Sequence, residues 1–177
     1  MSKRQGYTFE AEVQAGLELA KPAMWFKIPD GKSMGIRTPL KVPADFIYTF
    51  DSMCSIEAKH TKLQRMPWRN FKVHQVEWVL NNPRSAYFIV GFTHKRSKRV
   101  FLLFADQLYT FLDQFDTSIP MAAFEETCIE LTRLTGRHNP ERPHAFVQLD
   151  LSLIHTILSH QKPQYNLPVQ LYLACAK

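Results

Sequence analysis

The chain has 177 residues with a formal net charge of +6, and 45% of its residues are hydrophobic, which is typical of one globular domain. It lacks the run of about 18 apolar residues of a membrane span, and its amino terminus lacks the apolar segment of a signal peptide. Three widely spaced cysteines without a Cys-x-x-Cys pair argue against a zinc ribbon and favour a reducing compartment. We expect a cytoplasmic protein with no membrane partner, in a bacterial, archaeal or virus-infected host cell.

The positive charge is concentrated in three stretches that contain no acidic residue. They lie at residues 31–41, 58–76 and 95–99. Each stretch alone can be a solvated loop. Together they favour an anionic partner, and nucleic acid is the first candidate.

The first predicted elements are a helix over residues 8–19, with Thr8 as its cap, and a short strand over residues 24–28. The segment 27–42 carries Pro and Gly at intervals, so we expect a loop or an irregular hairpin. Its basic residues make it a candidate arm that reaches over DNA. The alternative is a plain insertion.

A hairpin is predicted next. Residues 46–50 are rich in aromatic and β-branched residues, Asp51-Ser52 is a turn signal, and residues 53–60 form the returning strand. Side chains alternate along a strand, so Glu57 and Lys59 point to one side, while Ile56 and Ala58 point to the other side, towards a core. Asp45, at the start of the first strand, can reach the side of Glu57 and Lys59.

The rest of the chain continues the alternation of helices and strands. The order of elements predicts an α/β fold with a mixed central sheet flanked by helices. We divide the chain into a core over residues 1–117 and a helical carboxy-terminal extension over residues 118–177, which packs on the core or forms a dimer interface. The remaining expected elements are a loop over 62–70 with a packed Trp68, a helix over 71–80, strands over 85–93 and 99–104 joined by a basic turn at 94–98, helices over 105–115, 121–134 and 149–160, a loop over 135–143, and a strand or irregular tail over 167–175.

Two carboxylates beside a lysine suggest metal-assisted chemistry on a phosphate. Asp45 and Glu57 can hold Mg²⁺, and Lys59 can orient or deprotonate a water or stabilise charge on a phosphate. The alternative is a half-exposed hairpin with a solvated Glu-Lys face. Glu10 lies in the first turn of its helix, where the helix dipole favours an acid. It can also join the metal, and Glu12 is the competing candidate.

The motif Pro43-Ala44-Asp45, followed by Glu57-Ala58-Lys59, resembles the PD-(D/E)XK nuclease superfamily. In chain order, Gly6-x-x-x-Glu10, these two motifs, and Phe71-Lys-Val-His-Gln75 resemble RecU-type Holliday-junction resolvases. The start also resembles that of archaeal Hjc-type resolvases. The resemblance covers roughly residues 4–112, and the segment 27–42 falls where RecU-type enzymes insert a stalk.

This resemblance implies a restriction-endonuclease-like core and a homodimer that cuts four-way DNA junctions with Mg²⁺, or with Mn²⁺ in its place. Asp45 and Glu57 would bind the metal, with the carbonyl of Ala58 completing the shell and Glu10 binding directly or through water. Lys59 would orient the attacking water, and Gln75 would hold the lysine or a metal-bound water.

The DNA would be bound by the basic stretches and by a polar pair after the lysine. The resemblance places His60 and Thr61 beside the adjacent phosphate. Two alternatives are another PD-(D/E)XK nuclease of the repair or restriction type and a non-catalytic DNA-binding module. The basic residues expected to contact DNA are Lys32, Arg37, Lys41, Lys62, Arg65, Arg69 and Lys72.

Overall fold

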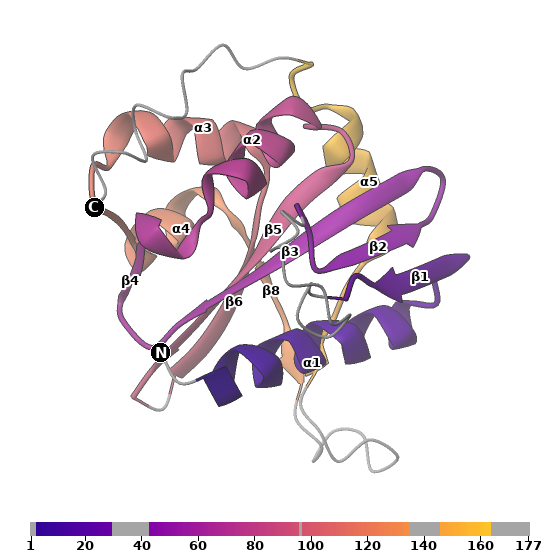
Figure 1. The fold of residues 1–177 in the computed structure, drawn as a ribbon, viewed down its shortest axis with the longest axis horizontal. Helices are drawn as coiled ribbons and strands as arrows, with labels where there is room; N and C mark the ends of the chain where they lie inside the picture. The colour runs from indigo at the N-terminus through magenta and orange to yellow at the C-terminus, as the bar shows by residue number, and fades with distance from the viewer. Residues whose placement is uncertain (1–2, 30–42, 96, 135–145, 164–177) are drawn as a thin grey trace, which may run out of the picture.

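A six-stranded mixed sheet forms the centre of the molecule (Figure 1). The computed structural model describes residues 3–29, 43–95, 97–134 and 146–163. The sheet order is β1-β2-β3-β5-β6-β8, and β3 pairs with β5 in parallel while every other neighbouring pair is antiparallel. This arrangement confirms the predicted α/β class. The strands are β1 (Met24–Lys27), β2 (Phe46–Thr49), β3 (Met53–Thr61), β5 (Ala86–His94), β6 (Ser97–Leu103) and β8 (Ile129–Leu131).

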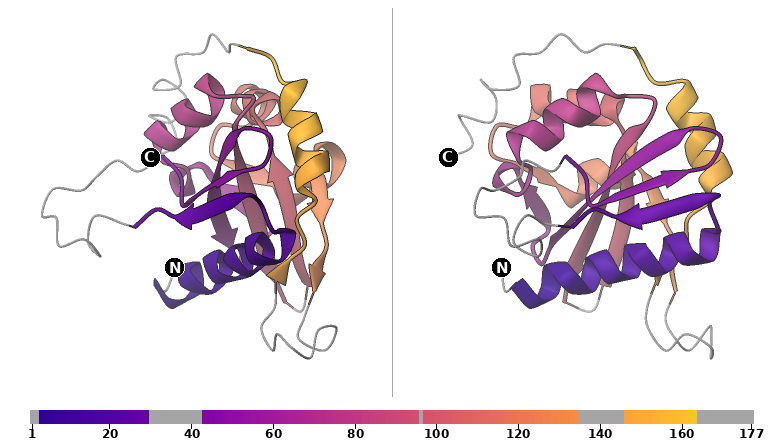
Figure 2. Two further views of the ribbon diagram at one scale, coloured as in Figure 1. Left: turned by 90° about the vertical axis from the view of Figure 1, so that its right-hand side faces the viewer. Right: turned by 45° about the vertical axis from the view of Figure 1, so that its right-hand side comes forward.

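Helices cover both faces of this sheet (Figures 1 and 2). On one face lie α1 (Lys3–Ala20) and α5 (Leu151–Ser159). On the other face lie α2 (Val73–Asn81), α3 (Ala105–Gln114) and α4 (Met121–Thr127). The molecule therefore has two hydrophobic cores, one on each side of the sheet.

Strand β5 is buried on both sides and divides the two cores. Phe88 and Val90 belong to the core under α2, α3 and α4. Tyr87 and Ile89 belong to the core under α1 and α5. A central strand covered on both faces needs an unbroken apolar run, and this explains the sequence Ala-Tyr-Phe-Ile-Val-Gly-Phe.

Several short strands and a 3₁₀ turn lie outside the central sheet. The segment 62–70, predicted as a loop, contains β4 and a 3₁₀ turn, and β4 pairs with β7. The predicted packing of Trp68 is confirmed, because its side chain is buried and its indole N–H donates to the carbonyl of Phe115 at 2.6 Å. These elements are β4 (Arg65–Pro67), η1 (Trp68–Asn70), β7 (Ser118–Pro120), β9 (Arg133–Leu134) and β10 (Phe146–Val147).

The helix predicted over residues 121–134 is wrong in its second half. Helix α4 ends at Thr127, and Cys128 adopts an extended conformation. Residues 129–131 then pair with β6, whose open edge satisfies their backbone donors and acceptors. Strand β8, which follows residue 117, thus forms an edge strand of the central sheet.

The other predicted helices and strands between residues 8 and 160 are confirmed to within a few residues of their ends. Two predictions about a helix end are wrong. Helix α1 begins at Lys3, so Thr8 lies inside the helix and does not cap it, and Glu10 does not lie in its first turn. The predicted tail at 167–175, the predicted loop at 135–143 and the predicted arm at 27–42 from residue 30 onward lie outside the described residues. Within the described part of the chain, no helix is long and apolar enough to cross a membrane.

Helix α1 approaches β10 so closely that Gly16 has no room for a side chain. A Cβ atom at Gly16 would overlap the backbone carbonyl oxygen of Val147. Replacing glycine by alanine in an exposed helix normally stabilises it by about 1 kcal/mol. Here we expect Gly16→Ala to lower the free energy of unfolding by about 1–3 kcal/mol instead, because backbone must move to admit the methyl group. Urea unfolding of both proteins measures this change, and a gain in stability would contradict the observed packing.

Candidate active site

The hairpin β2–β3 places Glu57 and Lys59 on the side of the sheet that faces α2. The two side chains alternate with Ile56 and Ala58 along β3, as predicted. Glu57 is 5% exposed and Lys59 is 9% exposed. Side chains with so little exposure do not form a solvated Glu-Lys face. Buried charges need partners, so the contacts of both side chains matter.

Glu57, Lys59 and Gln75 form a closed hydrogen-bonded triangle. The ammonium group of Lys59 donates to Glu57 Oε1 and to Gln75 Oε1, both at 2.7 Å. Gln75 Nε2 donates to Glu57 Oε1 at 2.6 Å. Gln75 also accepts the backbone N–H of Lys72 at 3.3 Å, so the start of α2 helps to hold its amide in place. The buried lysine is thus fixed by two side chains from different elements.

Asp45 joins this group from the start of β2. Its backbone N–H donates to the carbonyl of Ile56 at 2.9 Å, which fixes it beside β3. Its Oδ2 accepts the backbone N–H of Ala58 at 2.8 Å. The charge of Asp45 raises the pKa of Glu57, so the two carboxylates interact. The structure therefore brings together Asp45, Glu57, Lys59 and Gln75.

Burial disfavours the ionised form of both carboxylates. Desolvation raises the pKa of Glu57 to about 7, although the nearby Lys59 ammonium group opposes the shift. Desolvation also raises the pKa of Asp45, with the backbone N–H of Ala58 opposing it and the charge of Glu10 adding to it. A divalent cation would favour the ionised form of both groups.

One oxygen of this group is left without a partner. Glu57 Oε1 accepts two hydrogen bonds, whereas Glu57 Oε2 is buried and accepts none from the described residues. An unpaired buried carboxylate oxygen is costly, and a cation would remove that cost. The donor set of two carboxylates fits Mg²⁺, which keeps several waters and needs only one or two carboxylates.

No group of three or more His, Cys, Asp or Glu side chains in the described part of the chain could by itself hold a metal. The remaining ligands would then be waters, backbone oxygens such as that of Ala58, or substrate oxygens, as is usual for Mg²⁺.

The two acidic candidates on α1 have different surroundings. Glu10 accepts a salt bridge from Lys27 at 2.7 Å, and its charge still acts on Asp45. Glu12, the competing candidate, forms a two-pronged ion pair with Arg133, with both contacts at 2.7 Å. Glu10 therefore lies near the carboxylates of the sheet, whereas Glu12 is committed to a different partner.

The residues predicted to contact DNA fall into three groups. Lys32, Arg37 and Lys41 lie outside the described residues. Thr61 is buried, and its hydroxyl accepts the N–H of Leu63 at 3.2 Å; His60 is half-buried and hydrogen-bonds to Thr93 at 3.0 Å. The exposed cations are Lys62, Arg65, Arg69 and Lys72.

Sequence reasoning from the residues alone missed two contacts of this site. No local signal in the predicted helix over residues 71–80 marks Gln75 as facing inward, yet its side chain is 3% exposed and bridges Glu57 and Lys59. The partner of Glu10 was also missed. Lys27 reaches it because β1 pairs with β2 across the long segment between them, and no local signal predicts that pairing.

Comparison with known families gives one match. The family model described as Recombination protein U matches residues 44–137, more than half of the chain. The matched region contains Asp45, Glu57, Lys59 and Gln75 but not Glu10. It also extends past residue 117, through β8. A search of curated proteins found no match to this chain.

The raised pKa of Glu57 predicts how stability changes with pH in metal-free buffer. The folded protein keeps a proton on Glu57 up to about pH 7, whereas an unfolded glutamate loses it near pH 4.5. Glu57 therefore stabilises the folded state below pH 4.5. This contribution to the free energy of unfolding is lost as pH rises to 7. We expect a loss of up to about 3 kcal/mol in the free energy of unfolding.

Glu57→Gln should remove most of this decline between pH 5 and pH 8, as measured by urea unfolding in the presence of a chelator. Glu130→Gln is the matched control, because the exposed Glu130 has a lowered pKa through its pairing with Arg99 and should leave the decline unchanged. An equally steep decline in Glu57→Gln would contradict the assignment.

Proposed function

Because the chain belongs to the Recombination protein U family, a family of Holliday-junction resolvases, we propose that it is a metal-dependent endonuclease that cuts four-way DNA junctions by hydrolysing phosphodiester bonds. The observation that carries this proposal is the buried group of Asp45, Glu57, Lys59 and Gln75, with one carboxylate oxygen left for a cation. The group comes from three separate elements, and the family match covers all of it.

Asp45 and Glu57 would bind Mg²⁺, with the carbonyl of Ala58 as a further ligand and Mn²⁺ as a substitute metal. Glu10 would contribute directly or through water, in competition with its salt bridge to Lys27. When bound, the metal would supply Lewis-acid stabilisation of the phosphate oxygens and a water of lowered pKa.

Lys59 would act on the attacking water and on the charge of the scissile phosphate. Its ammonium group has three N–H donors, and two of them are used by Glu57 and Gln75. The third has no acceptor among the residues that the structure describes and is available for a water or a phosphate oxygen. Because both partners are themselves fixed, the amine would be held in one orientation before substrate binds, which reduces the reorganisation needed in the transition state.

DNA would be held mainly through its phosphates. Among the exposed cations, Arg65, Arg69 and Lys72 follow β3 and lead into α2, close in sequence to both Lys59 and Gln75. Phosphate contacts position a duplex without reading its sequence, which suits a structure-selective enzyme. A homodimer with twofold symmetry would present two such sites and would suit paired cuts across a junction.

Lys59→Ala tests the catalytic assignment. With Mg²⁺ present, we expect the rate of junction cleavage to fall by about 100-fold or more, because a fixed charge beside the transferring phosphate is lost. Binding of the junction should change by less than about threefold, because one buried cation contributes little to a phosphate interface. Single-turnover cleavage and gel-shift titration measure the two quantities.

Lys162→Ala is the matched control for this variant. Lys162 is exposed beyond α5 and is not among the residues proposed to act in cleavage or DNA binding, so its removal should change neither quantity. Normal cutting by Lys59→Ala would refute the assignment of Lys59.

A panel of substrates tests the junction assignment. We expect a four-way junction to be cut at least about tenfold faster than linear duplex, flap or hairpin DNA of the same sequence, because a factor of ten needs only about 1.4 kcal/mol of selective binding. Rates should be compared at saturating Mg²⁺ and at one ionic strength. Equal rates on all substrates would instead indicate a general PD-(D/E)XK nuclease, and binding without cutting would indicate a DNA-binding module.

A further inference from the structure

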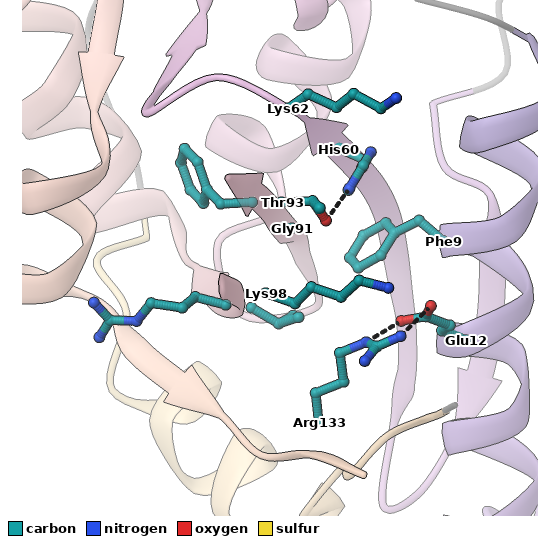
Figure 3. Close-up of a pocket in the computed structure, with 11 residues that line it drawn as sticks. Phe9, Glu12, His60, Lys62, Gly91, Thr93, Lys98 and Arg133 are labelled. Atoms are coloured by element: carbon teal, nitrogen blue, oxygen red, sulfur yellow. Dashed lines mark hydrogen bonds and ion pairs between the residues drawn. The ribbon is translucent and has the colours of Figure 1, made fainter. Parts of the chain in front are cut away.

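A pocket of about 240 Å³ lies on the α1 side of the sheet (Figure 3). Phe9 and Glu12 line it from α1, and residues of β3, β5, β6 and β9 complete its walls. Gly91 permits this shape: a Cβ atom there would come within 2.5 Å of the Phe9 ring, so the helix lies directly on β5. The pocket shares none of its lining residues with the group around Lys59.

The pocket is lined by four cationic residues and one acid. Arg133 is neutralised by Glu12, and Arg99 forms ion pairs with Glu125 and Glu130 away from the pocket. These ion pairs link the elements that surround the pocket.

Two cations of the pocket remain uncompensated. Lys62 and Lys98 are exposed, and neither has a carboxylate partner among the residues that the structure describes. Figure 3 shows Lys98 extending across the pocket towards Phe9 and Glu12. The pocket therefore presents excess positive charge from two flexible lysines.

His60 adds a polar wall without adding charge. Its Nε2 atom is 3.0 Å from the hydroxyl of Thr93, and its ring lies 5.3 Å from that of Phe9. Burial lowers the pKa of His60. An imidazole, a hydroxyl and two ammonium groups suit an anion with several acceptor oxygens, which describes a phosphate group.

This pocket and the proposed catalytic group lie on opposite faces of the same strand. His60 follows Lys59 directly in β3, and neighbouring side chains of a strand point to opposite faces. The sheet separates the two, so one phosphate cannot contact both. A volume of about 240 Å³ leaves room for a phosphate group.

We propose that this pocket binds a backbone phosphate from a second arm of branched DNA, while the first arm is held at the group around Lys59. The inference rests on the proposed function, because it assumes that DNA is the substrate. A linear duplex at the catalytic face presents no second arm, whereas a junction directs strands away from the cleavage point. The pocket would thus add affinity for branched DNA alone.

The test compares Lys98→Ala with the wild-type protein in metal-free buffer, where DNA is bound and not cut. We expect the affinity for a four-way junction to fall about fivefold and the slope of log K against log[salt] to weaken by about 0.9, the value for one lost phosphate contact. The affinity for linear duplex should not change. Lys98→Arg should restore the junction affinity, and Lys162→Ala should match the wild-type protein.

Several outcomes would overturn the inference. Unchanged junction affinity in Lys98→Ala would contradict it. An equal loss of affinity for junction and for duplex would also contradict it, because the pocket would then lie on the path of the first arm. A free phosphate compound is the other source of this chemistry, so inorganic phosphate is titrated while the His60 ring signals are followed by NMR. The pocket would be assigned to a free ligand if inorganic phosphate binds saturably, if Lys98→Ala abolishes that binding, and if the junction affinity of Lys98→Ala is unchanged.

Failure here is distinguishable from failure of the proposed function. If Lys59→Ala still abolishes junction cutting while Lys98→Ala has no effect, the nuclease assignment stands and the second-arm site is wrong. If the wild-type protein shows no preference for junctions, the junction assignment and the second-arm site are both wrong, and cleavage that depends on Lys59 would still indicate a nuclease.

Discussion

The buried ammonium group of Lys59 is the constraint on which the rest of the site depends. A lysine with 9% exposure needs partners, and it finds them in Glu57 on its own strand and Gln75 on α2. These bonds tie α2 to β3 at one defined point. The same bonds use one oxygen of Glu57 and leave the other without a partner among the described residues, so the arrangement that satisfies the lysine also leaves an oxygen for the proposed cation. The network is therefore specific in geometry even though a buried ion pair contributes little net stability.

Strand β3 organises two different surfaces because its side chains alternate. Glu57 and Lys59 face α2, and the half-buried His60 faces α1. The parallel pairing of β3 with β5 places this strand inside the sheet, where both faces are covered. In the proposed function, one short segment would thus serve the chemistry on one side and selection of branched DNA on the other.

Local patterns predicted the hairpin and the shared face of Glu57 and Lys59, because alternation along a strand needs no tertiary information. They could not predict that Gln75 faces inward, since that depends on how α2 docks. The pair of Glu12 and Arg133 joins residues 121 positions apart, and no local signal connects them. Local pattern predicts helix at β8 because three residues beside a helix carry little pattern, and only the open edge of β6 decides their conformation.

The contact of Gly16 with Val147 has a consequence for the order of folding. Helix α1 lies near the start of the chain, yet its apolar residues Phe9, Val13 and Leu17 share a core with Val147 and Leu151. The strands that share this core with α1 are translated before residue 104, whereas β10 and α5 follow only from residue 146. Completion of this layer is therefore a late, long-range event, and a nascent chain stalled before residue 146 would leave part of its apolar surface exposed to chaperones.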